Sequence, residues 1–484
     1  MNHWTQRRRL LAGLVAALSL LVHLKGIRAP LLDYHFHRQV NTASIARNYW
    51  REARPIHRPR VDWEGPEDRM AATELPVQTW LYGKLWPLFG LGESWGRILS
   101  TAASALTAFF LFLLFERELG TESAFYGAAL FCLLPVEIYF GRTVQPEACA
   151  LLGVVSALYF WERALAPGRP LWPWAISVFS AFVAVGLKLP YAYVLIPLAA
   201  LTWRRLGRGT LLDARLWLAG LLAMGGVFAW YRYAGAGVYV VPTHSGEFWR
   251  ILGYRRTLYF AQFLVFSRFL EIIATYGGTV LFFFGARELL WRRRDAFWLA
   301  WLGGVFFHLL ALGEYGHSHD YTCLPLAPVA AGLMGVGLRL LMERARAAIS
   351  PSWALSGVFL LVASIPAHAA LRIAHWYRQG FDYLSRAGEA AAAVSRPGDL
   401  FFTSCMAPSV ALYYLDRRGW SDDLASQLPA NALAAIAQKR LAGARFLAVE
   451  KKGAWAQPDG ALWKDLRSRS QPVWDDGRLA IFRL

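Results

Sequence analysis

Long runs of apolar residues, separated by short charged clusters, constrain the fold of this chain more than any other feature. The runs begin near Leu10 and recur to about residue 370, and most approach the length of about 20 residues at which an α-helix crosses a bilayer. Hydrophobic residues make up 56% of the 484 residues, more than a soluble domain of this length would bury. We therefore predict a polytopic α-helical membrane protein.

About eleven apolar segments are predicted to span the membrane as helices. They cover approximately residues 10–24, 96–115, 124–140, 147–164, 171–187, 189–203, 215–233, 272–290, 296–313, 321–342 and 353–370. The first segment follows Arg7–Arg9, a pattern that a cleaved signal peptide shares. The many later spans favour a retained first helix with a cytoplasmic N-terminus.

The distribution of arginine supports this count of spans. The net charge of +18 does not indicate nucleic-acid binding, because the basic residues are not gathered on one face. When the predicted spans alternate across the bilayer, nearly every short basic cluster falls on one side, as the positive-inside rule requires. These clusters contain Arg117, Arg163, Arg169, Arg204, Arg205, Arg208, Arg292–Arg294, Arg344 and Arg346.

The opposite, outer side receives a long first loop at residues 26–95, which we group with the spans in a membrane domain, residues 1–380. The second half of this loop, Thr73–Phe89, is aromatic and amphipathic but too polar to span. It is predicted to lie in the membrane interface as a helix. Another outer stretch, Ala234–Ile272, is equally rich in aromatic residues and arginine.

The chain becomes far less apolar after about residue 380, and residues 381–484 are predicted to form a small α/β domain on the outer side. The expected strands lie at 400–404, 445–450 and 479–484, and the expected helices at 407–416 and 431–442. None of the four cysteines has the spacing of a metal site or a disulfide framework.

One polar stretch, Asp33–Thr42 (DYHFHRQVNT), directly follows the first predicted span. It combines an acid, two histidines, an arginine and a glutamine within ten residues. In an extended backbone Asp33, His35 and His37 point the same way, and in a helix Asp33 and His37 share a face. Either geometry places an acid near an imidazole at a membrane boundary, although a solvated loop with incidental charge is the alternative.

Further polar groups are predicted just outside the bilayer on the same outer side, at the ends of spans or in the interfacial helix. They are Glu74, Lys84, Arg142, Gln145, Glu147, Lys188, His317, His319 and Asp320. Ionisable groups next to spans usually face a cavity or a partner, because they are costly in lipid. Each also has a purely structural explanation, such as a snorkelling Lys188, an ion pair between Arg142 and Glu147, or the wet face of an interfacial helix for Glu74 and Lys84.

An acid accompanied by several cations suits the transfer of a group from a phosphate carrier. The acid removes a proton from the acceptor, while lysine and arginine stabilise a phosphate that leaves with negative charge. The histidine groups are also able to bind a divalent metal with Asp33, but no spacing requires one, so the metal content is left open.

These features together resemble the GT-C glycosyltransferases of the bacterial protein-mannosyltransferase and aminoarabinose-transferase type, glycosyltransferase family 39. The matching stretches are LLDYHFHRQVNTA around Asp33, Glu74-Leu-Pro76, GRTVQPE after the third span, Lys188-Leu-Pro190 after the fifth, and HSHDYTCLPLAP before the tenth. The C-terminal pattern of PGD, a strand, YYLDRRGW and a strand after Gly443-Ala444-Arg445 also resembles bacterial members. Short motifs thus carry the resemblance over almost the whole chain.

The resemblance implies an inverting glycosyltransferase with a polytopic membrane domain. Such an enzyme moves one sugar from a polyprenyl-phosphate carrier to a lipid, glycan or protein acceptor on the periplasmic side of the bacterial inner membrane. Asp33 matches the family's acidic position and is the expected general base. The family has an Asp-Glu pair where this chain has Asp33-Tyr34, so Glu74 or Glu147 is left to fill the second acidic role.

The remaining site residues are assigned from this picture. Lys84, Arg142 and Lys188 are expected to contact the phosphate, and His319 and Tyr321 to shape the donor pocket. The other expected substrate-binding residues are His35, Arg38, Gln39, Glu147 and His317. The expected partners are the lipid-linked donor, membrane lipid and an acceptor of unknown identity, with no nucleic acid and no certain cofactor.

Two other functions are compatible with the same sequence. One is a transporter or flippase that carries an outer domain, and the other is an O-antigen ligase or polymerase acting on lipid-linked glycans. Transporters usually place their binding groups near the midplane and show paired halves, whereas the charges here sit at span ends and no internal repeat is visible.

Overall fold

The computed structural model describes residues 3–239, 258–405, 408–456 and 460–484, so the predicted outer stretch Ala234–Ile272 lies partly outside the described residues. The chain divides into two compact units. The first consists of Met1–Ile27, Gly96–Gly235 and Val241–Trp376, and the second of Arg28–Trp95, Ala236–Val240 and Tyr377–Leu484.

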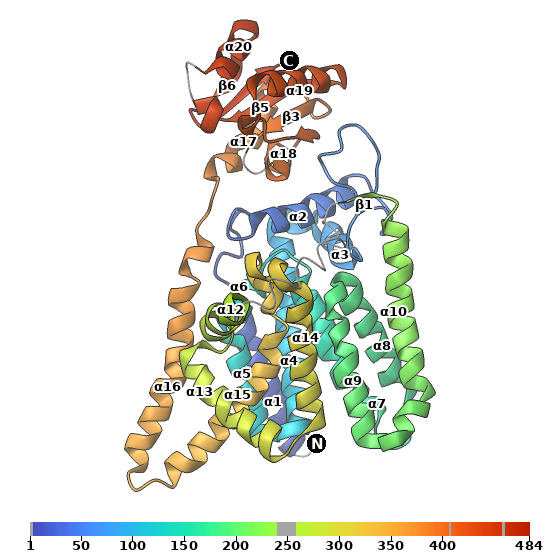
Figure 1. Ribbon diagram of the computed structural model, residues 1–484, viewed down its shortest axis with the longest axis vertical. Coiled ribbons are helices and arrows are strands. Elements are labelled where there is room, and N and C mark those ends of the chain that lie inside the picture. The colour runs from blue at the N-terminus through green and yellow to red at the C-terminus, as the bar shows by residue number, and fades with distance from the viewer. Residues whose placement is uncertain (1–2, 240–257, 406–407, 457–459) are drawn as a thin grey trace. The chain divides into compact units, whose positions relative to one another are not determined.

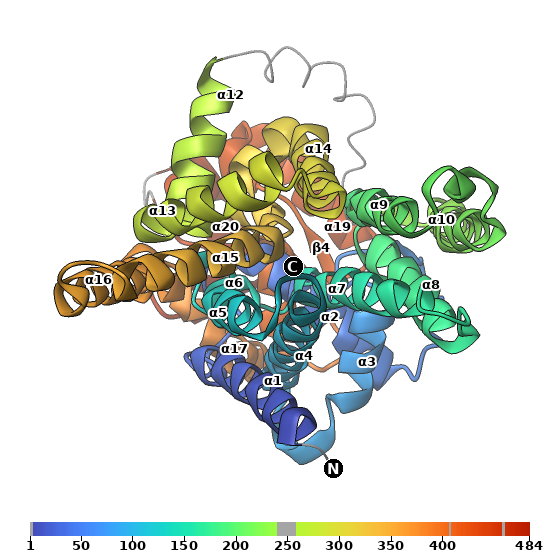
Figure 2. The ribbon, with the colours of Figure 1, turned by 90° about the horizontal axis from the view of Figure 1, so that it is seen from below.

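The first unit is a bundle of helices, which Figure 1 shows from the side and Figure 2 shows end-on. Its helices are α1 (His3–Val22), α4 (Glu93–Leu119), α5 (Thr121–Cys132), α6 (Pro135–Phe140), α7 (Glu147–Ala164), α8 (Leu171–Leu187), α9 (Leu195–Leu206), α10 (Ala214–Ala234), α12 (Leu258–Gln262), α13 (Thr275–Ala286), α14 (Ala296–Ser318), α15 (Leu326–Arg346) and α16 (Pro351–Arg372). Every predicted span overlaps one of these helices or two in succession, although the span 189–203 begins with a 3-10 helix, Leu189–Val194, and the span 272–290 ends in a π-helix, Arg287–Arg292. The segment 124–140 is divided because Pro135, which cannot continue a helix, begins α6.

Among the described residues, four helices are long and apolar enough to cross a membrane, namely α4, α10, α15 and α16. The pair Leu258–Ile273 and Thr275–Arg292 adds one more candidate, bent by 103° between its halves. Shorter apolar helices lie at Leu171–Leu187 and Ala296–Leu312. The predicted helical architecture, with helices suited to a membrane, is therefore confirmed, while the number of spans stays a prediction.

Glycines on α15 let the neighbouring helices approach it closely. A Cβ atom on Gly335 would lie 2.4 Å from the carbonyl oxygen of Ser123 on α5. One on Gly337 would lie 1.9 Å from the carbonyl oxygen of Leu281 on α13. Backbone contact through small residues is a common way to pack helices in lipid, where the hydrophobic effect does not drive helices together.

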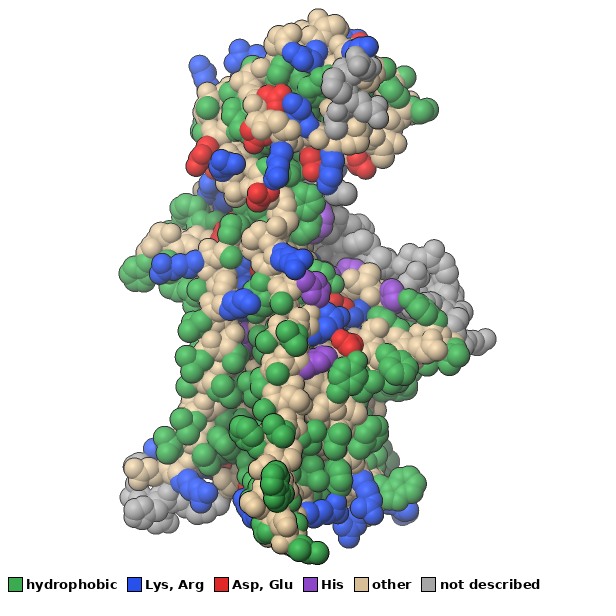
Figure 3. All heavy atoms as spheres, turned by 90° about the vertical axis from the view of Figure 1, so that its left-hand side faces the viewer, with side chains coloured by type: hydrophobic (Ala, Val, Ile, Leu, Met, Phe, Trp, Pro, Cys, Tyr) green, Lys and Arg blue, Asp and Glu red, His purple; other side chains and the backbone are tan. Residues whose placement is uncertain are grey.

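The basic connections of the first unit gather at one end of the bundle. Figure 1 shows the connections α7–α8, α9–α10 and α15–α16 at the lower end, and Figure 3 shows Lys and Arg side chains there, below a hydrophobic surface. The last turns of α9 and α15 carry Arg204, Arg205, Arg344 and Arg346. The predicted grouping of arginines is thus present, and the direction of the bundle across the membrane stays a prediction.

The second unit combines the first loop with the C-terminal segment. Its helices are α2 (Phe36–Arg51), α3 (Val77–Leu85), α17 (Ala387–Val394), α18 (Pro408–Leu415), α19 (Pro429–Leu441) and α20 (Ala461–Arg469). Its strands are β1 (Ala71–Ala72), β2 (Val238–Tyr239), β3 (Leu400–Ser404), β4 (Gly419–Ser421), β5 (Ala444–Glu450), β6 (Pro472–Asp475) and β7 (Leu479–Arg483). The two shortest, β1 and β2, pair with each other in parallel.

The C-terminal segment forms the small α/β sheet that the sequence predicts. The strand order is β4-β3-β5-β7-β6, with β3 parallel to β4 and β5, and β7 antiparallel to β5 and β6. Phe402, Leu447, Trp463 and Phe482 are buried in its core. The three expected strands and two expected helices are present. The edge strands β4 and β6 were not predicted, because they are short and partly exposed. The predicted domain boundary near residue 380 stays a prediction.

Candidate active site

Asp33 lies in the turn before α2, and its side chain is almost fully buried, with 1% exposed. The helix begins at Phe36, after His35 adopts a left-handed backbone conformation with φ of 58°. Asp33 is therefore outside the helix, and the alternative in which it shares a helix face with His37 is wrong. The side-chain amide of Gln39 donates to Oδ1 of Asp33 across 2.6 Å. Because a buried carboxylate is costly without such donors, Gln39 both stabilises and orients it.

Arg38 and Glu74, two predicted site residues distant in the sequence, form an ion pair. Arg38 is in the first turn of α2 and Glu74 precedes α3. Glu74 also accepts a hydrogen bond of 2.9 Å from the hydroxyl of Thr73. A carboxylate that is bound to a guanidinium holds the cation in place, so this geometry favours an orienting role for Glu74 over proton removal.

The other predicted residues of the first loop make contacts with aromatic rings. The rings of Tyr34 and His35 lie 4.2 Å apart. His37 stacks on Phe36 at 4.2 Å, and burial lowers the pKa of its imidazole. Lys84 lies on the exposed side of α3, where its Nζ is 5.4 Å from the centre of the Trp80 ring.

The first unit brings four other predicted residues together. Nζ of Lys188, which follows α8, lies 2.7 Å from Oε1 of Glu147, the first residue of α7. The same Nζ is 5.5 Å from the centre of the Tyr321 ring. The ring of His319 lies 5.3 Å from that of Tyr321. Lys188 therefore contacts a carboxylate and an aromatic face, and Glu147 pairs with Lys188 as a buried ion pair.

Tyr315 orders the aromatic half of this group. Its hydroxyl lies 2.8 Å from that of Tyr321, and its ring stacks on His319 at 4.0 Å. Nδ1 of His319 lies 2.9 Å from the carbonyl oxygen of Tyr315. Tyr315 was not predicted as a site residue, although it is part of the same polar stretch, EYGHSHDY, that supplied the two histidines.

Arg142 is fully buried in the turn after α6. Its Nη1 donates to the carbonyl oxygen of Gly26 at 3.4 Å, and its guanidinium carbon lies 4.9 Å from the centre of the Tyr139 ring. A guanidinium stays charged at every physiological pH, so this residue places a permanent buried positive charge in the predicted turn.

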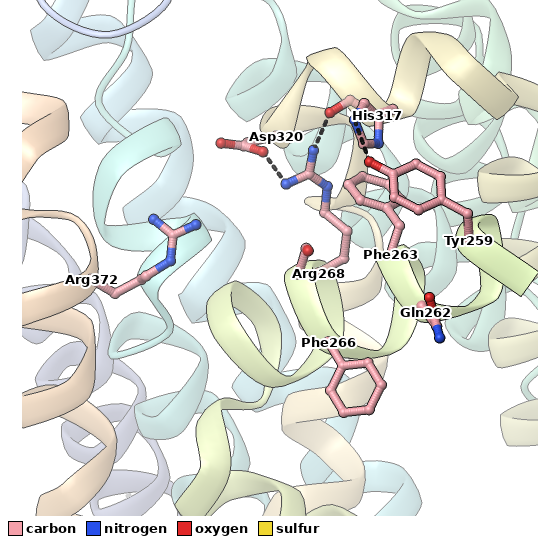
Figure 4. Close-up of a pocket in the computed structure, with 9 residues that line it drawn as sticks. Tyr259, Gln262, Phe263, Phe266, Arg268, His317, Asp320 and Arg372 are labelled. Atoms are coloured by element: carbon pink, nitrogen blue, oxygen red, sulfur yellow. Dashed lines mark hydrogen bonds and ion pairs between the residues drawn. The ribbon is translucent and has the colours of Figure 1, made fainter.

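His317 faces a separate cavity of about 520 Å³, shown in Figure 4. The cavity is lined by Tyr259, Gln262, Phe263, Phe266, Ser267, Arg268, His317, Asp320 and Arg372. Arg268 forms an ion pair with Asp320 and donates from Nη2 to the carbonyl oxygen of His317 across 2.7 Å. Sequence reasoning missed Arg268, although its positive charge lies inside the largely apolar run FLVFSRFLEII.

The geometry gives no support to a metal site. In the parts of the chain that the structure describes, no three His, Cys, Asp or Glu side chains are placed to hold a metal ion.

Comparison with known proteins identifies the fold. The structure matches ArnT from Cupriavidus metallidurans in the apo state with a TM-score of 0.65 and 14% identity, covering 100% of this chain and 98% of ArnT. The chain has the GT-C glycosyltransferase fold. Residues 73–231 also match the family model of dolichyl-phosphate-mannose-protein mannosyltransferases. The resemblance to the GT-C glycosyltransferases is thus confirmed at the level of the fold.

Two further structures share the fold while holding a lipid carrier. ArnT from Cupriavidus metallidurans bound to undecaprenyl phosphate matches with a TM-score of 0.61 and 14% identity, covering 97% of each chain. The oligosaccharyltransferase AglB from Archaeoglobus fulgidus, in complex with an inhibitory peptide and a dolichol-phosphate, matches with a TM-score of 0.58 and 11% identity. That match covers 93% of this chain and 70% of AglB. No curated protein sequence matches this chain.

Proposed function

We propose that this protein is an inverting glycosyltransferase that moves one sugar from a polyprenyl-phosphate-linked donor to an acceptor on the periplasmic side of the bacterial inner membrane. The observation that carries the proposal is Asp33, a buried carboxylate that Gln39 holds at the acidic position of the family motif. The matched ArnT and AglB structures hold undecaprenyl phosphate and a dolichol-phosphate, which supports a lipid-phosphate carrier for this chain.

Asp33 acts as the general base in this proposal. Its carboxylate accepts the proton of an acceptor hydroxyl, and the oxygen of that hydroxyl attacks the anomeric carbon of the donor. The bond between that carbon and the phosphate oxygen breaks through an oxocarbenium-like transition state, and polyprenyl phosphate leaves with the bonding electrons. A single displacement inverts the anomeric configuration.

Arg142 and Lys188 are proposed to bind the departing phosphate. Arg142 offers a permanent charge and a planar set of donors that matches phosphate oxygens. Lys188 already contacts Glu147, but an ammonium group has three donors, so this ion pair does not exclude a phosphate contact. Lys84 lies on the exposed side of α3, and its predicted contact with phosphate stays a prediction.

The remaining residues are assigned to substrate binding. The stacked rings of Tyr315 and His319, with Tyr321 at an angle to them, offer an aromatic surface for the donor. Glu74 is proposed to orient Arg38, and Glu147 to orient Lys188. His35 and His317 are proposed to contact substrate through their imidazoles.

A transfer assay with defined donors tests the proposal. The purified protein in lipid nanodiscs is incubated with radiolabelled hexose, pentose and aminosugar forms of undecaprenyl phosphate, and with an envelope extract of a deletion strain as acceptor. We expect one donor to lose its sugar to the extract, with release of undecaprenyl phosphate and an inverted anomeric centre. Retained configuration, or no transfer from any donor, would contradict it.

A further inference from the structure

The segment that carries Asp33 is held on both sides by the C-terminal part of the second unit. The backbone N–H of Leu31 donates to the hydroxyl of Tyr414 across 2.8 Å. The backbone N–H of Gly380 donates to the carbonyl oxygen of Leu32, also across 2.8 Å. On the other side of Asp33, the ring of Phe36 lies 5.0 Å from that of Phe381. These contacts fix the backbone immediately before and after the carboxylate.

The same C-terminal stretch also holds helix α2, which carries Gln39. Arg47 donates from Nη1 to the carbonyl oxygen of Tyr413 across 2.8 Å, and the same nitrogen lies 2.9 Å from Asp416. One turn later, Arg51 forms two hydrogen bonds to Asp416, of 2.6 and 3.0 Å. Arg47 is largely buried, so this part of the contact is shielded from water.

The loop that follows α2 is joined to the next residues of the same stretch. The N–H of Gly419 donates to the carbonyl oxygen of Asp62 at 3.1 Å, and the N–H of Gly65 donates to the carbonyl oxygen of Gly419 at 2.8 Å. The motif YYLDRRGW, residues 413–420, thus contacts the first loop at several points along its length.

We propose that the C-terminal segment positions Asp33 for catalysis, with Tyr414 as the principal positioning residue. This inference rests on the proposed function, in which Asp33 is the general base. Displacement of a reacting group by about 1 Å can cost about 10²-fold in rate, so a catalytic carboxylate needs support from outside its own turn. The sheet domain is then a part of the catalytic machinery rather than an appended module.

Tyr414 is the contact that a single substitution removes most cleanly. Leu31 is fully buried, so water does not readily replace the hydroxyl as the acceptor of its N–H. Tyr414→Phe deletes this acceptor and keeps the ring. The buried segment that includes Asp33 is expected to shift or to fluctuate, while the sheet domain stays folded.

The test compares Tyr414→Phe with Tyr49→Phe in the full-length protein in nanodiscs. Tyr49, near the other end of α2, donates its hydroxyl to the carbonyl oxygen of Ile56 across 2.5 Å, so its substitution also removes a hydroxyl bound to backbone. We expect Tyr414→Phe to lower kcat about tenfold with KM for the lipid-phosphate donor within about twofold, and Tyr49→Phe to keep both within about twofold. Hydrogen exchange of residues 28–36 is expected to quicken only in Tyr414→Phe.

The double variant Asp33→Asn/Tyr414→Phe separates this inference from the proposed function. If Tyr414 acts through Asp33, the double variant loses no more turnover than Asp33→Asn alone. A further tenfold loss in the double variant, or wild-type kcat and exchange in Tyr414→Phe, would overturn the positioning role while leaving Asp33 as the base. Full turnover in Asp33→Asn would overturn the proposed base itself, and with it the catalytic part of this inference.

Discussion

The side-chain amide of Gln39 donates a hydrogen bond of 2.6 Å to Oδ1 of Asp33, and both side chains are buried. Gln39 belongs to the first turns of α2, whereas Asp33 precedes the helix. The hydrogen bond therefore anchors the Asp33 carboxylate, which lies in a turn, to helix α2. Because one oxygen is bound to Gln39, the direction of the other oxygen is fixed as well.

Gln39→Leu removes this donor with little change in volume. We expect kcat to fall about tenfold while donor binding is retained, because the carboxylate loses the group that orients it. A matched control is Gln427→Leu, which removes a partly exposed glutamine that donates to Asp422 across 3.1 Å. Turnover numbers of both variants, with donor binding measured by native mass spectrometry, check the prediction. Wild-type turnover in Gln39→Leu would contradict it.

Substitutions in the ion pair between Lys188 and Glu147 test whether Lys188 has a structural or a functional role. Lys188→Ala leaves a buried carboxylate without its cation, which is expected to cost about 3–5 kcal/mol of stability. The double variant Glu147→Gln/Lys188→Met replaces the pair by uncharged side chains and is expected to recover most of that stability.

Donor binding distinguishes the two roles in the double variant. If Lys188 contacts the phosphate, binding of undecaprenyl phosphate stays weak although thermal stability returns, because no cation has been restored. Recovery of both stability and binding would show that Lys188 has a structural role alone.

Asp416 makes the stability of the second unit depend on pH. Burial alone would raise the pKa of Asp416, but the hydrogen bond from Arg51 and the charge of Arg47 outweigh burial and hold the pKa below its usual value. A depressed pKa in the folded state stabilises the protein above the unfolded pKa, and this contribution is lost as pH falls through the folded pKa. We expect Tm to fall below about pH 4, and to fall less steeply there in Asp416→Asn, which starts from a lower Tm at pH 7. If Tm, measured by thermal unfolding at a series of pH values, falls equally steeply with pH in the wild type and in Asp416→Asn, this prediction is contradicted.

The contact of α15 with α5 allows a test of the helix packing. Gly335→Ala places a methyl group 2.4 Å from the carbonyl oxygen of Ser123, so the helices must separate, at an expected cost of about 1–3 kcal/mol. Gly357 on α16 is the matched control, because a Cβ atom there meets nothing within 4 Å. Thermal unfolding in detergent is expected to occur at lower temperature for Gly335→Ala and not for Gly357→Ala. Equal melting temperatures would argue against the close contact.

The hydrophobic pattern of the sequence was sufficient to predict the helices of the bundle and the strands β3, β5 and β7 of the C-terminal sheet, but not its edge strands β4 and β6. Long apolar runs predicted the helices whose lipid-facing and buried residues are both mainly apolar, as in α4 and α15. Helix α2 was harder to predict from the sequence, because it is polar on average and is stabilised by contacts such as that of Arg47 with Asp62. Partners of this kind are distant in the chain, and periodicity does not reveal them.

The candidate site was predicted by residue type but not by pairing. The sequence indicated Glu147 and Lys188, yet offered Arg142 as the partner of Glu147, and the structure shows an ion pair with Lys188. It likewise named Gln39 only as a substrate-binding residue, whereas the structure shows Gln39 donating a hydrogen bond to Asp33. One sequence shows which charges lie at span ends, but which of them meet is decided by the packing of helices.

The central claim, that Asp33 is the general base, is tested most directly by the turnover of Asp33→Asn. The substitution keeps the size and much of the hydrogen bonding of the side chain but removes its charge and basicity. Asp68→Asn, which changes an exposed aspartate of the same loop, serves as the control. Sugar transfer from the lipid-phosphate donor is measured with purified protein in nanodiscs, and donor binding is measured separately. We predict a loss of about 10²–10⁴-fold in turnover with donor binding retained, and normal turnover in Asp68→Asn; full turnover in Asp33→Asn would contradict the account.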